Sequence, residues 1–204
     1  MPGFDTIFDG SEMDTLIYLK NLLTDGYIAS ITPTSKFVVK RVCEKINFFE
    51  SKLIVEYGPG TGIFTWSLLK EMTDQCSLIA VERNSNFCRF LKKNIRDPRL
   101  AVFHDSAENI LDILKSRNGS SEPQADCILS GIPFSLLSRK TKMAILRNAY
   151  SALRPGGKFL AYQAFFQFPA HLKSPLKEIF QDVRARYVMP CLPPLLILEA
   201  TKNI

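Results

Sequence analysis

The sequence has no long hydrophobic run, although 46% of its 204 residues are hydrophobic. Its apolar stretches are short and broken by charges, well below the roughly 18 consecutive apolar residues that a membrane-spanning helix needs. The first ten residues, MPGFDTIFDG, lack the basic start and the apolar block of a secretory signal. The sequence therefore predicts a cytoplasmic protein that does not cross a membrane, with one sizeable core.

Cysteine and histidine are also scarce. The five cysteines are widely spaced and form no C-x-x-C pair, so neither a zinc site nor a redox motif is predicted. We interpret them as reduced, packed thiols, because free cysteine is usually buried. The two histidines are His104 and His171, and His104, which ends a strand, is interpreted as a core or rim residue rather than a catalytic base. The sequence thus predicts no metal site.

Acidic residues are outnumbered, with 20 acids against 26 bases and a net charge of +6. Five of these acids and a single base lie in residues 1–30, so the remainder of the chain carries the basic surplus. That surplus fits a polyanionic partner, either nucleic acid or acidic lipid, and it fits simple solubility equally well. Charge alone leaves the choice open.

Two helices are expected before the main domain. Residues 12–25 have helical hydrophobic spacing. Ser11 precedes them, and Asp14 follows Ser11 at capping-box spacing. A second, basic helix is predicted over 36–49, after Thr34 or Ser35 as its cap. We expect residues 1–50 to form a helical appendage and residues 51–204 to form the main domain.

From residue 52 onward, short β-branched runs alternate with longer amphipathic stretches, which is typical of parallel strands joined by helical crossovers. The expected fold is α/β, a Rossmann-like doubly wound sheet of seven strands whose last strand is antiparallel. Strands are predicted at 52–57, 77–82, 100–104, 126–130, 157–164, 183–188 and 194–201. Helices are predicted at 62–72, 84–95, 107–116, 138–152 and 171–181.

A glycine-rich turn follows the first strand of this domain, in the run Gly58-Pro59-Gly60-Thr61-Gly62. Glycines let the backbone turn tightly and approach a ligand, and the helix that follows points free N–H groups at it. The G-x-G-x-G spacing fits a pyrophosphate-binding loop poorly. Preceded by the acid Glu56, it resembles motif I of class I S-adenosylmethionine-dependent methyltransferases.

Glu82 ends the next strand, twenty residues after Gly62, where an acid can accept hydrogen bonds from both ribose hydroxyls. The methyltransferase resemblance implies that Asp105 and Ser106 lie beside the adenine, and helix capping is the competing role of Asp105. The same resemblance implies that Glu56 organises the glycine loop and the methionine end of the cofactor. The predicted cofactor-binding residues are Glu56, Gly58, Gly60, Gly62, Glu82, Asp105 and Ser106.

The methyl acceptor is expected beyond the fourth strand, because ligands of open α/β sheets lie outside the carboxyl ends of the strands. The predicted catalytic residues there are Ser130, Gly131, Ile132, Pro133 and Phe134. Enzymes that methylate base amines commonly place Asn-Pro-Pro-aromatic or Asn-Ile-Pro-aromatic at this point. The chain therefore resembles ribosomal RNA adenine dimethylases in outline, but Gly131 replaces the Asn, and no length after Ile204 is left for their helical RNA-binding domain.

A closer resemblance, from about Leu19 onward, is to bacterial phospholipid N-methyltransferases. The matching segments are SITPTS (30–35), VEYGPGTG (55–62), AVER (80–83), LSGIPF (129–134), LRPGGKF (153–159) and CLPPLLILEATK (191–202). Two departures are Cys191, where Asn is common, and the acidic first helix. The resemblance implies N-methylation of an amine on a lipid head group, and phosphatidylethanolamine is the first expected substrate. The alternatives are an RNA adenine N-methyltransferase and a nucleotide-binding Rossmann-type protein without methyltransferase activity.

Some side chains have two interpretations. The basic helix over 36–49 could contact the inner face of a membrane, but packing on the sheet is preferred. A phenol at Tyr27, Tyr57 or Tyr162 could orient the acceptor amine, but packing is preferred there too. Three bases could attract a phosphate head group and are interpreted as a solvated face: Arg139, Lys140 and Lys142. The number of methyl groups transferred and the oligomeric state stay open.

Overall fold

A computed structural model describes residues 36–118, 124–164, 170–188 and 195–203. The helix expected over 12–25 and the position of Cys191 lie outside these residues. The strands are β1 (Leu53–Tyr57), β2 (Ser77–Glu82), β3 (Leu100–His104), β4 (Ala125–Ser130), β5 (Leu153–Ala164), β6 (Asp182–Val188) and β7 (Leu195–Thr201). The helices are α3 (Lys36–Cys43), α4 (Ile63–Glu71), α5 (Ser85–Asn94), α6 (Ile110–Asn118), α7 (Arg139–Ala152) and α8 (Ala170–Lys177), with short 3-10 helices η1 (Ala107–Asn109) and η2 (Phe134–Leu136).

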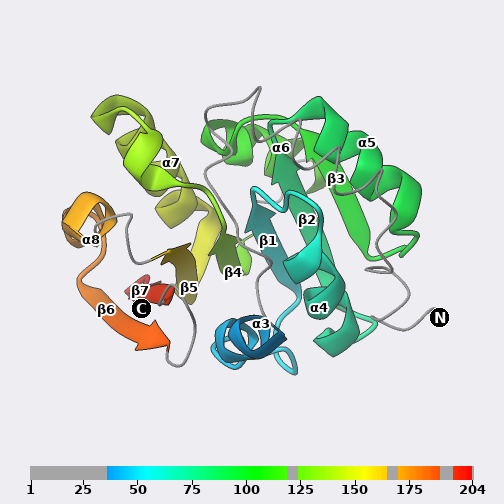
Figure 1. Ribbon diagram of the computed structural model, residues 1–204, viewed down its shortest axis with the longest axis horizontal. Helices are drawn as coiled ribbons and strands as arrows, with labels where there is room; N and C mark the ends of the chain where they lie inside the picture. Colours follow the sequence, from blue (N-terminus) through cyan, green and yellow to red (C-terminus); the bar gives the residue numbers. More distant parts are fainter. Residues whose placement is uncertain (1–35, 119–123, 165–169, 189–194, 204) are drawn as a thin grey trace. The chain divides into compact units, whose positions relative to one another are not determined.

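All seven strands form one sheet in the order β3-β2-β1-β4-β5-β7-β6 (Figure 1). The pairings among β1 to β5 are parallel, whereas β7 runs antiparallel to both β5 and β6. This confirms the predicted doubly wound sheet with an antiparallel last strand. The direction of winding reverses between β1 and β4, and such a reversal opens a crevice at the carboxyl ends of the two strands.

Helices pack on both faces of the sheet. One apolar cluster joins the sheet to α3, α4 and α5, and the other joins it to α6, α7 and α8. In the first cluster Val38, Val39 and Val42 of α3 are at most 4% exposed. The apolar side of α3 is therefore buried against the sheet, which confirms the preferred interpretation of that helix.

Four boundaries differ from the prediction. The helix expected to reach residue 49 ends at Cys43, because the next amides, of Lys45 and Ile46, bond to carbonyls only three residues back and tighten the backbone into turns. The helix expected at 107–116 is divided into η1 and α6, and α8 ends at Lys177. Strand β5 begins at Leu153 rather than 157, since α7 leads straight into it and a register shift in the β4–β5 pairing accommodates the extra residues of β5.

Four of the five cysteines are free and buried, as predicted: Cys43, Cys76, Cys88 and Cys127. Burial raises the pKa of each thiol, to about 11 at Cys76 and Cys88. These thiols are therefore protonated and unreactive at neutral pH.

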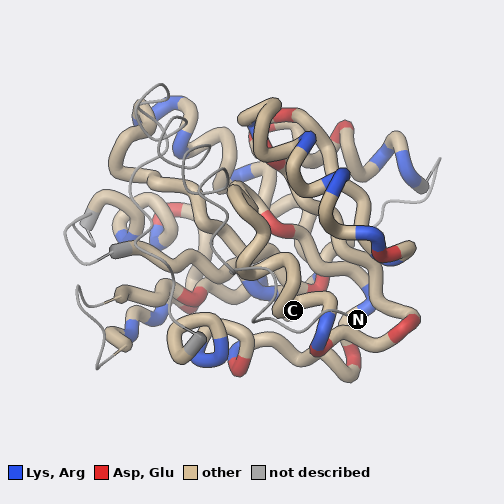
Figure 2. The backbone as a smooth tube through the Cα atoms, turned by 45° about the vertical axis from the view of Figure 1, so that its right-hand side comes forward, with Lys and Arg blue, Asp and Glu red and all other residues tan. Residues whose placement is uncertain are grey.

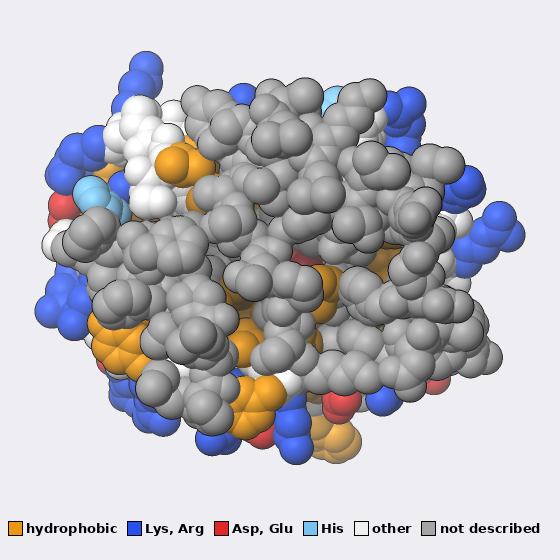
Figure 3. All heavy atoms as spheres, in the orientation of Figure 1, with side chains coloured by type: hydrophobic (Ala, Val, Ile, Leu, Met, Phe, Trp, Pro, Cys, Tyr) orange, Lys and Arg blue, Asp and Glu red, His pale blue; other side chains and the backbone are white. Residues whose placement is uncertain are grey.

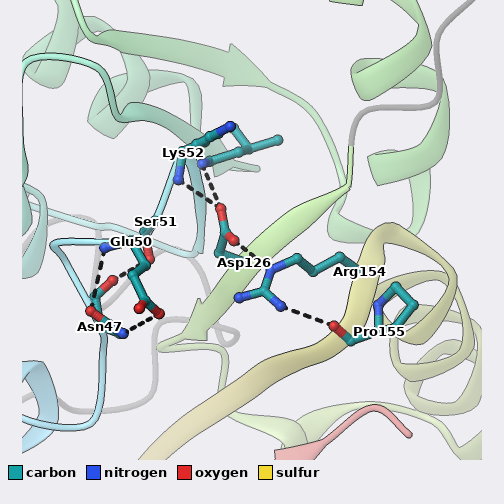
Figure 4. A network of polar contacts seen from close by, with 8 residues as sticks. Asn47, Glu50, Ser51, Lys52, Asp126, Arg154 and Pro155 are labelled. Carbon is teal, nitrogen blue, oxygen red and sulfur yellow. Dashed lines mark hydrogen bonds and ion pairs between the residues drawn. The ribbon is translucent and has the colours of Figure 1, made fainter. Parts of the chain in front are cut away.

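Asp126 ties the amino end of the sheet together (Figure 4). Its Oδ2 accepts hydrogen bonds from the backbone N–H groups of Lys52 (2.7 Å) and Leu53 (2.9 Å), at the start of β1. Its Oδ1 pairs with Nε of Arg154 at 2.5 Å. Burial opposes the charged carboxylate, but these bonds outweigh it and lower the pKa of Asp126. One side chain of β4 thus fixes both neighbouring strands, at the end of the sheet opposite the crevice.

The substitution Asp126→Ala removes this tie and leaves two backbone donors without an acceptor. Bonds to a charged group contribute about 1.5–3 kcal/mol, so we expect a loss of about 2–3 kcal/mol in the free energy of unfolding. Urea denaturation at pH 7 measures it. Asp182→Asn is the matched control, because the Asp182–Arg184 pair has side chains 46% and 62% exposed, and we expect a change below about 0.5 kcal/mol. Equal losses in the two variants would contradict this role.

Candidate active site

The glycine loop after β1 has the backbone form that the sequence predicts. Gly60 and Gly62 have φ of 57° and 86°, in the left-handed region that favours glycine. A Cβ at Gly62 would lie 2.7 Å from Cδ2 of Leu91 on α5, so glycine is needed there for helix packing. Among the described residues, a Cβ at Gly60 would meet nothing within 4 Å. The tip of the loop is therefore not packed against any described part of the chain.

Glu82 is only 7% exposed and holds this tip in place. One carboxylate oxygen accepts a hydrogen bond from the N–H of Gly60 at 3.0 Å, and the other accepts from the N–H of Asn84 at 2.8 Å. The side chain that ends β2 is thus bonded to the loop that follows β1. The sequence placed Glu82 at this edge but did not indicate its bond to Gly60, because the two residues are far apart in the chain.

Glu56 is 1% exposed and lies one residue before the end of β1. Its Oε2 accepts a hydrogen bond from the hydroxyl of Thr65 at 2.7 Å, whereas no described residue bonds to Oε1. Burial raises the pKa of Glu56 to about 8, the Thr65 bond works in the opposite direction, and the charge of Glu82 adds to the rise. This buried carboxylate oxygen, without a partner among the described residues, is an unused acceptor next to a second acid.

Asp105 and Ser106 follow β3 at the same edge of the sheet. The Oδ1 of Asp105 accepts hydrogen bonds from the N–H of Ser106 and the amide of Asn109, both at 2.7 Å. Ser106, not Asp105, is the residue before η1 whose side chain caps it, accepting from the N–H of Glu108 at 3.3 Å. The bonds of Asp105 order the turn after β3 next to Glu82, whose carbonyl accepts the N–H of Asp105 at 3.1 Å.

The segment after β4 lies directly beside the glycine loop. The N–H of Gly131 donates to the carbonyl of Tyr57 at 2.9 Å, and a Cβ at Gly58 would lie 3.3 Å from the side chain of Ile132. Ser130 is fully buried, and its hydroxyl accepts from the N–H of Ile132 at 3.3 Å. The fold thus brings the two predicted loops together across the crevice.

Phe134, the last predicted catalytic residue, is fully buried and packs edge-on against Phe159, with ring centroids 6.3 Å apart. Its ring therefore anchors the segment in the core. Pro133 immediately precedes η2 as its N-cap residue. Within the segment, Gly131 and Ile132 are the residues in contact with the glycine loop.

The remaining candidates lie elsewhere. The Nε2 of His104 is 3.0 Å from the carbonyl oxygen of Arg83, at the exposed end of β3. Arg139 is exposed and pairs with Glu178 at 3.0 Å. The prediction of a solvated face is wrong for Lys142, which is 7% exposed, because its Nζ reaches back to donate to the carbonyl of His171 at 2.9 Å.

The described residues contain no group of His, Cys, Asp and Glu side chains that could hold a metal ion. Within the same residues, no helix combines the length and the apolar character that crossing a bilayer requires. Lys and Arg occur on several elements of the described chain and are interspersed with Asp and Glu (Figure 2). The basic surplus is therefore not concentrated on one element.

Comparison with known proteins gives a family match and a curated relative. The model of the ribosomal RNA adenine dimethylase family matches residues 33–114. An ornithine lipid N-methyltransferase of Singulisphaera acidiphila is 25% identical over 163 residues, which cover 76% of this chain and 83% of the relative. A match of that length extends past residue 114, so it includes part of the chain that the family model leaves out.

Solved structures show the same fold. The precorrin-6y C5,15-methyltransferase of Geobacter metallireducens superposes with a TM-score of 0.67 at 16% identity, covering 88% of this chain and 96% of its own. A methyltransferase of Pyrococcus furiosus gives 0.61 at 17% identity, covering 96% and 100%. Both are methyltransferases by name, and their likeness to this chain is one of fold.

The high pKa of Glu56 predicts a pH dependence of stability. A carboxyl whose pKa is raised on folding stabilises the fold below its unfolded pKa, and this contribution is lost as the pH rises through the folded value. Relative to Glu56→Gln, the free energy of unfolding of the wild type should fall between about pH 4.5 and pH 8, by up to about 1.4 kcal/mol per pH unit. Urea denaturation of both proteins across this range tests it, and parallel curves would contradict the raised pKa.

Proposed function

We propose that this chain, a class I S-adenosylmethionine-dependent methyltransferase, transfers the methyl group of its cofactor to the amine of a lipid head group. The observation that carries the proposal is the similarity to an ornithine lipid N-methyltransferase over 76% of the chain. Phosphatidylethanolamine is the first expected substrate and ornithine lipid the second, since each presents a primary amine in its head group.

The residues at the crevice fit this cofactor. We assign the ribose hydroxyls to Glu82 and the ammonium group of the methionine end to Glu56, whose buried Oε1 lacks a partner among the described residues. No described residue packs against the position of a Cβ at Gly60, and we assign this side of the loop to the cofactor. Asp105 and Ser106 order the turn assigned to the adenine. When bound, the cofactor supplies an electrophilic methyl group on a sulfonium.

The task of the protein is then to align the acceptor. Methyl transfer to an amine is an in-line displacement, and holding the reacting atoms at about 3 Å supplies much of the rate. We assign this alignment to the segment Ser130–Phe134. Its backbone is fixed to β1 through Gly131 and to the core through Phe134, so it forms a rigid wall beside the glycine loop.

The region around α3 supports contact with a lipid surface. Phe37 on α3 is 40% exposed and Phe49 in the following turns is 88% exposed. Lys40 and Arg41 are exposed on the same helix, and the Arg41 guanidinium lies 5.4 Å from the centre of the Phe37 ring. Basic side chains beside exposed aromatic rings favour the interface of an anionic bilayer. Figure 3 shows further Lys and Arg side chains around the rim of one face.

Methylation of RNA adenine is the second candidate, because the adenine dimethylase family model matches this chain. That match ends at residue 114, before the segment 130–134 to which we assign the acceptor. It therefore supports the cofactor-binding half of the domain and is silent about the acceptor. Gly131 also has no side-chain amide, whereas the adenine dimethylases that this chain resembles have an Asn at this position to hold the base amine.

Incubating the pure protein with methyl-labelled S-adenosylmethionine separates the candidates. Vesicles of phosphatidylethanolamine with anionic phospholipid, vesicles with ornithine lipid, and total RNA are the acceptors. We expect label in the aminolipids, more in vesicles that contain anionic lipid, and none in vesicles of phosphatidylcholine, whose nitrogen has no lone pair. Labelled RNA without labelled lipid would replace the proposal by the second candidate.

Glu82 provides a test of the cofactor assignment. Since charge-assisted hydrogen bonds contribute about 1.5–3 kcal/mol, Glu82→Ala should weaken the binding of S-adenosylhomocysteine at least tenfold by calorimetry. Glu178→Gln, which removes an exposed carboxylate, is the control and should bind normally.

Glu82 also holds Gly60, so a second ligand separates loss of the ribose contact from loss of loop order. The wild type should prefer S-adenosylhomocysteine to its 2′-deoxy analogue, and Glu82→Ala should bind the two equally. A variant that keeps the full preference would remove the ribose role.

A further inference from the structure

We propose that the hydroxyl of Tyr162 positions the acceptor amine, in the place that an Asn side chain would take if it stood at Gly131. This inference rests on the proposed amine methylation and names the side chain that receives the amine. Tyr162 lies on β5, outside the segment that the sequence assigned to the acceptor.

The register of the sheet brings the two residues together. Strand β4 pairs with β5 so that Ser130 lies opposite Ala161, and Gly131 and Tyr162 are the next residues along. A Cβ on Gly131 would lie 2.9 Å from Cζ of Tyr162 and closer still to its hydroxyl oxygen. The same Cβ would lie 3.1 Å from the carbonyl oxygen of Gly58. The hydroxyl therefore occupies the space of a side chain at position 131, between the glycine loop and the acceptor segment.

Packing fixes the ring in this place. Tyr162 is 8% exposed and stacks on Phe64 of α4, with ring centroids 4.2 Å apart and planes at 29°. Phe64 follows the glycine loop by two residues, so the loop and the ring are positioned by the same helix start. A ring held in this way keeps its hydroxyl at one point.

The Tyr162 hydroxyl lies where a side chain at position 131 would stand, and a buried tyrosine usually places its hydroxyl against a polar partner. Tyr57 differs, because its ring belongs to the apolar cluster on the opposite face of the sheet from Tyr162 and is fully buried there. Of these two candidate tyrosines, Tyr162 has its hydroxyl at the junction of the glycine loop and the acceptor segment.

The phenol acts as a neutral hydrogen-bond acceptor. Burial, followed by the charges of Glu56 and Glu82, raises the pKa of Tyr162 well above its ordinary value, so the hydroxyl keeps its proton at working pH and does not serve as a base. By accepting one amine N–H, it directs the nitrogen lone pair at the methyl carbon. The N–C bond forms as the C–S bond breaks with its electron pair left on sulfur, and the resulting ammonium releases its proton to water.

The same geometry sets specificity. An Asn at position 131 would collide with the ring of Tyr162, so the Gly131–Tyr162 pair and an Asn side chain exclude each other. A hydroxyl offers one acceptor point, whereas an Asn side chain presents a carbonyl oxygen and an NH₂ group together. One point is enough for a small, flexible alkylamine.

Tyr162→Phe tests the proposal because the ring and its stacking on Phe64 are kept. With aminolipid vesicles we expect kcat to fall at least tenfold, while the affinity for S-adenosylhomocysteine and the thermal midpoint stay within error of the wild type. Tyr150→Phe on α7, remote from the crevice, is the control and should keep full activity. A kcat equal to that of the wild type overturns the proposal, as does a loss of activity matched by lost cofactor affinity.

A double-mutant cycle of unfolding free energies tests the contact between Gly131 and Tyr162 without an activity assay. Gly131→Ala should destabilise the wild type, and the cost should be smaller in the Tyr162→Phe background, since the nearest atom to the new Cβ is gone. Additive losses would contradict the geometry. If the wild type labels only RNA, the lipid function fails and this proposal fails with it; if it labels lipid and Tyr162→Phe does so equally well, this proposal alone fails.

Discussion

The carboxylate of Glu82 joins the two strand ends on which the site is built. It is buried, and its two oxygens accept the backbone N–H groups of Gly60 and Asn84, so the loop after β1 and the turn after β2 are held by one side chain. The turn after β3 adds to this, because the N–H of Asp105 bonds to the backbone carbonyl of the same residue. The crevice is thereby held in shape by bonds within the protein itself, and such preorganisation lowers the ordering cost of binding.

Holding the loop with acids has an electrostatic cost. Glu56 and Glu82 are both buried, and their repulsion adds to the burial that raises the pKa of Glu56. A cationic ligand at Glu56 removes this cost, since an opposite charge favours the ionised carboxyl. With a pKa raised to about 8, the carboxyl of Glu56 keeps its proton at neutral pH, and the proposed ammonium contact would favour its ionised form.

Much of this fold could be predicted from the sequence, because hydrophobic periodicity and glycine spacing are local signals. Six of the seven strands begin and end within one residue of their predicted limits, and β1, β2 and β4 carry the motif residues at their carboxyl ends. Partners far apart in the chain gave no such signal. The bond from Gly60 to Glu82, the burial of Lys142 against His171, and the approach of Tyr162 to Gly131 all depend on which strands and helices become neighbours.

The approach of Tyr162 to Gly131 shows how an absent side chain can be informative. In the sequence, Gly131 stands where the adenine dimethylases have an Asn whose side-chain amide holds the base amine. In the structure, the space is filled from the next strand, by a ring that Phe64 fixes and whose hydroxyl faces the glycine loop. Because β4 and β5 pair in parallel, a residue one step past the end of β4 always has a β5 neighbour at the same level. The acceptor site that we propose therefore draws on two strands, and a substitution in either one changes the space left for the other.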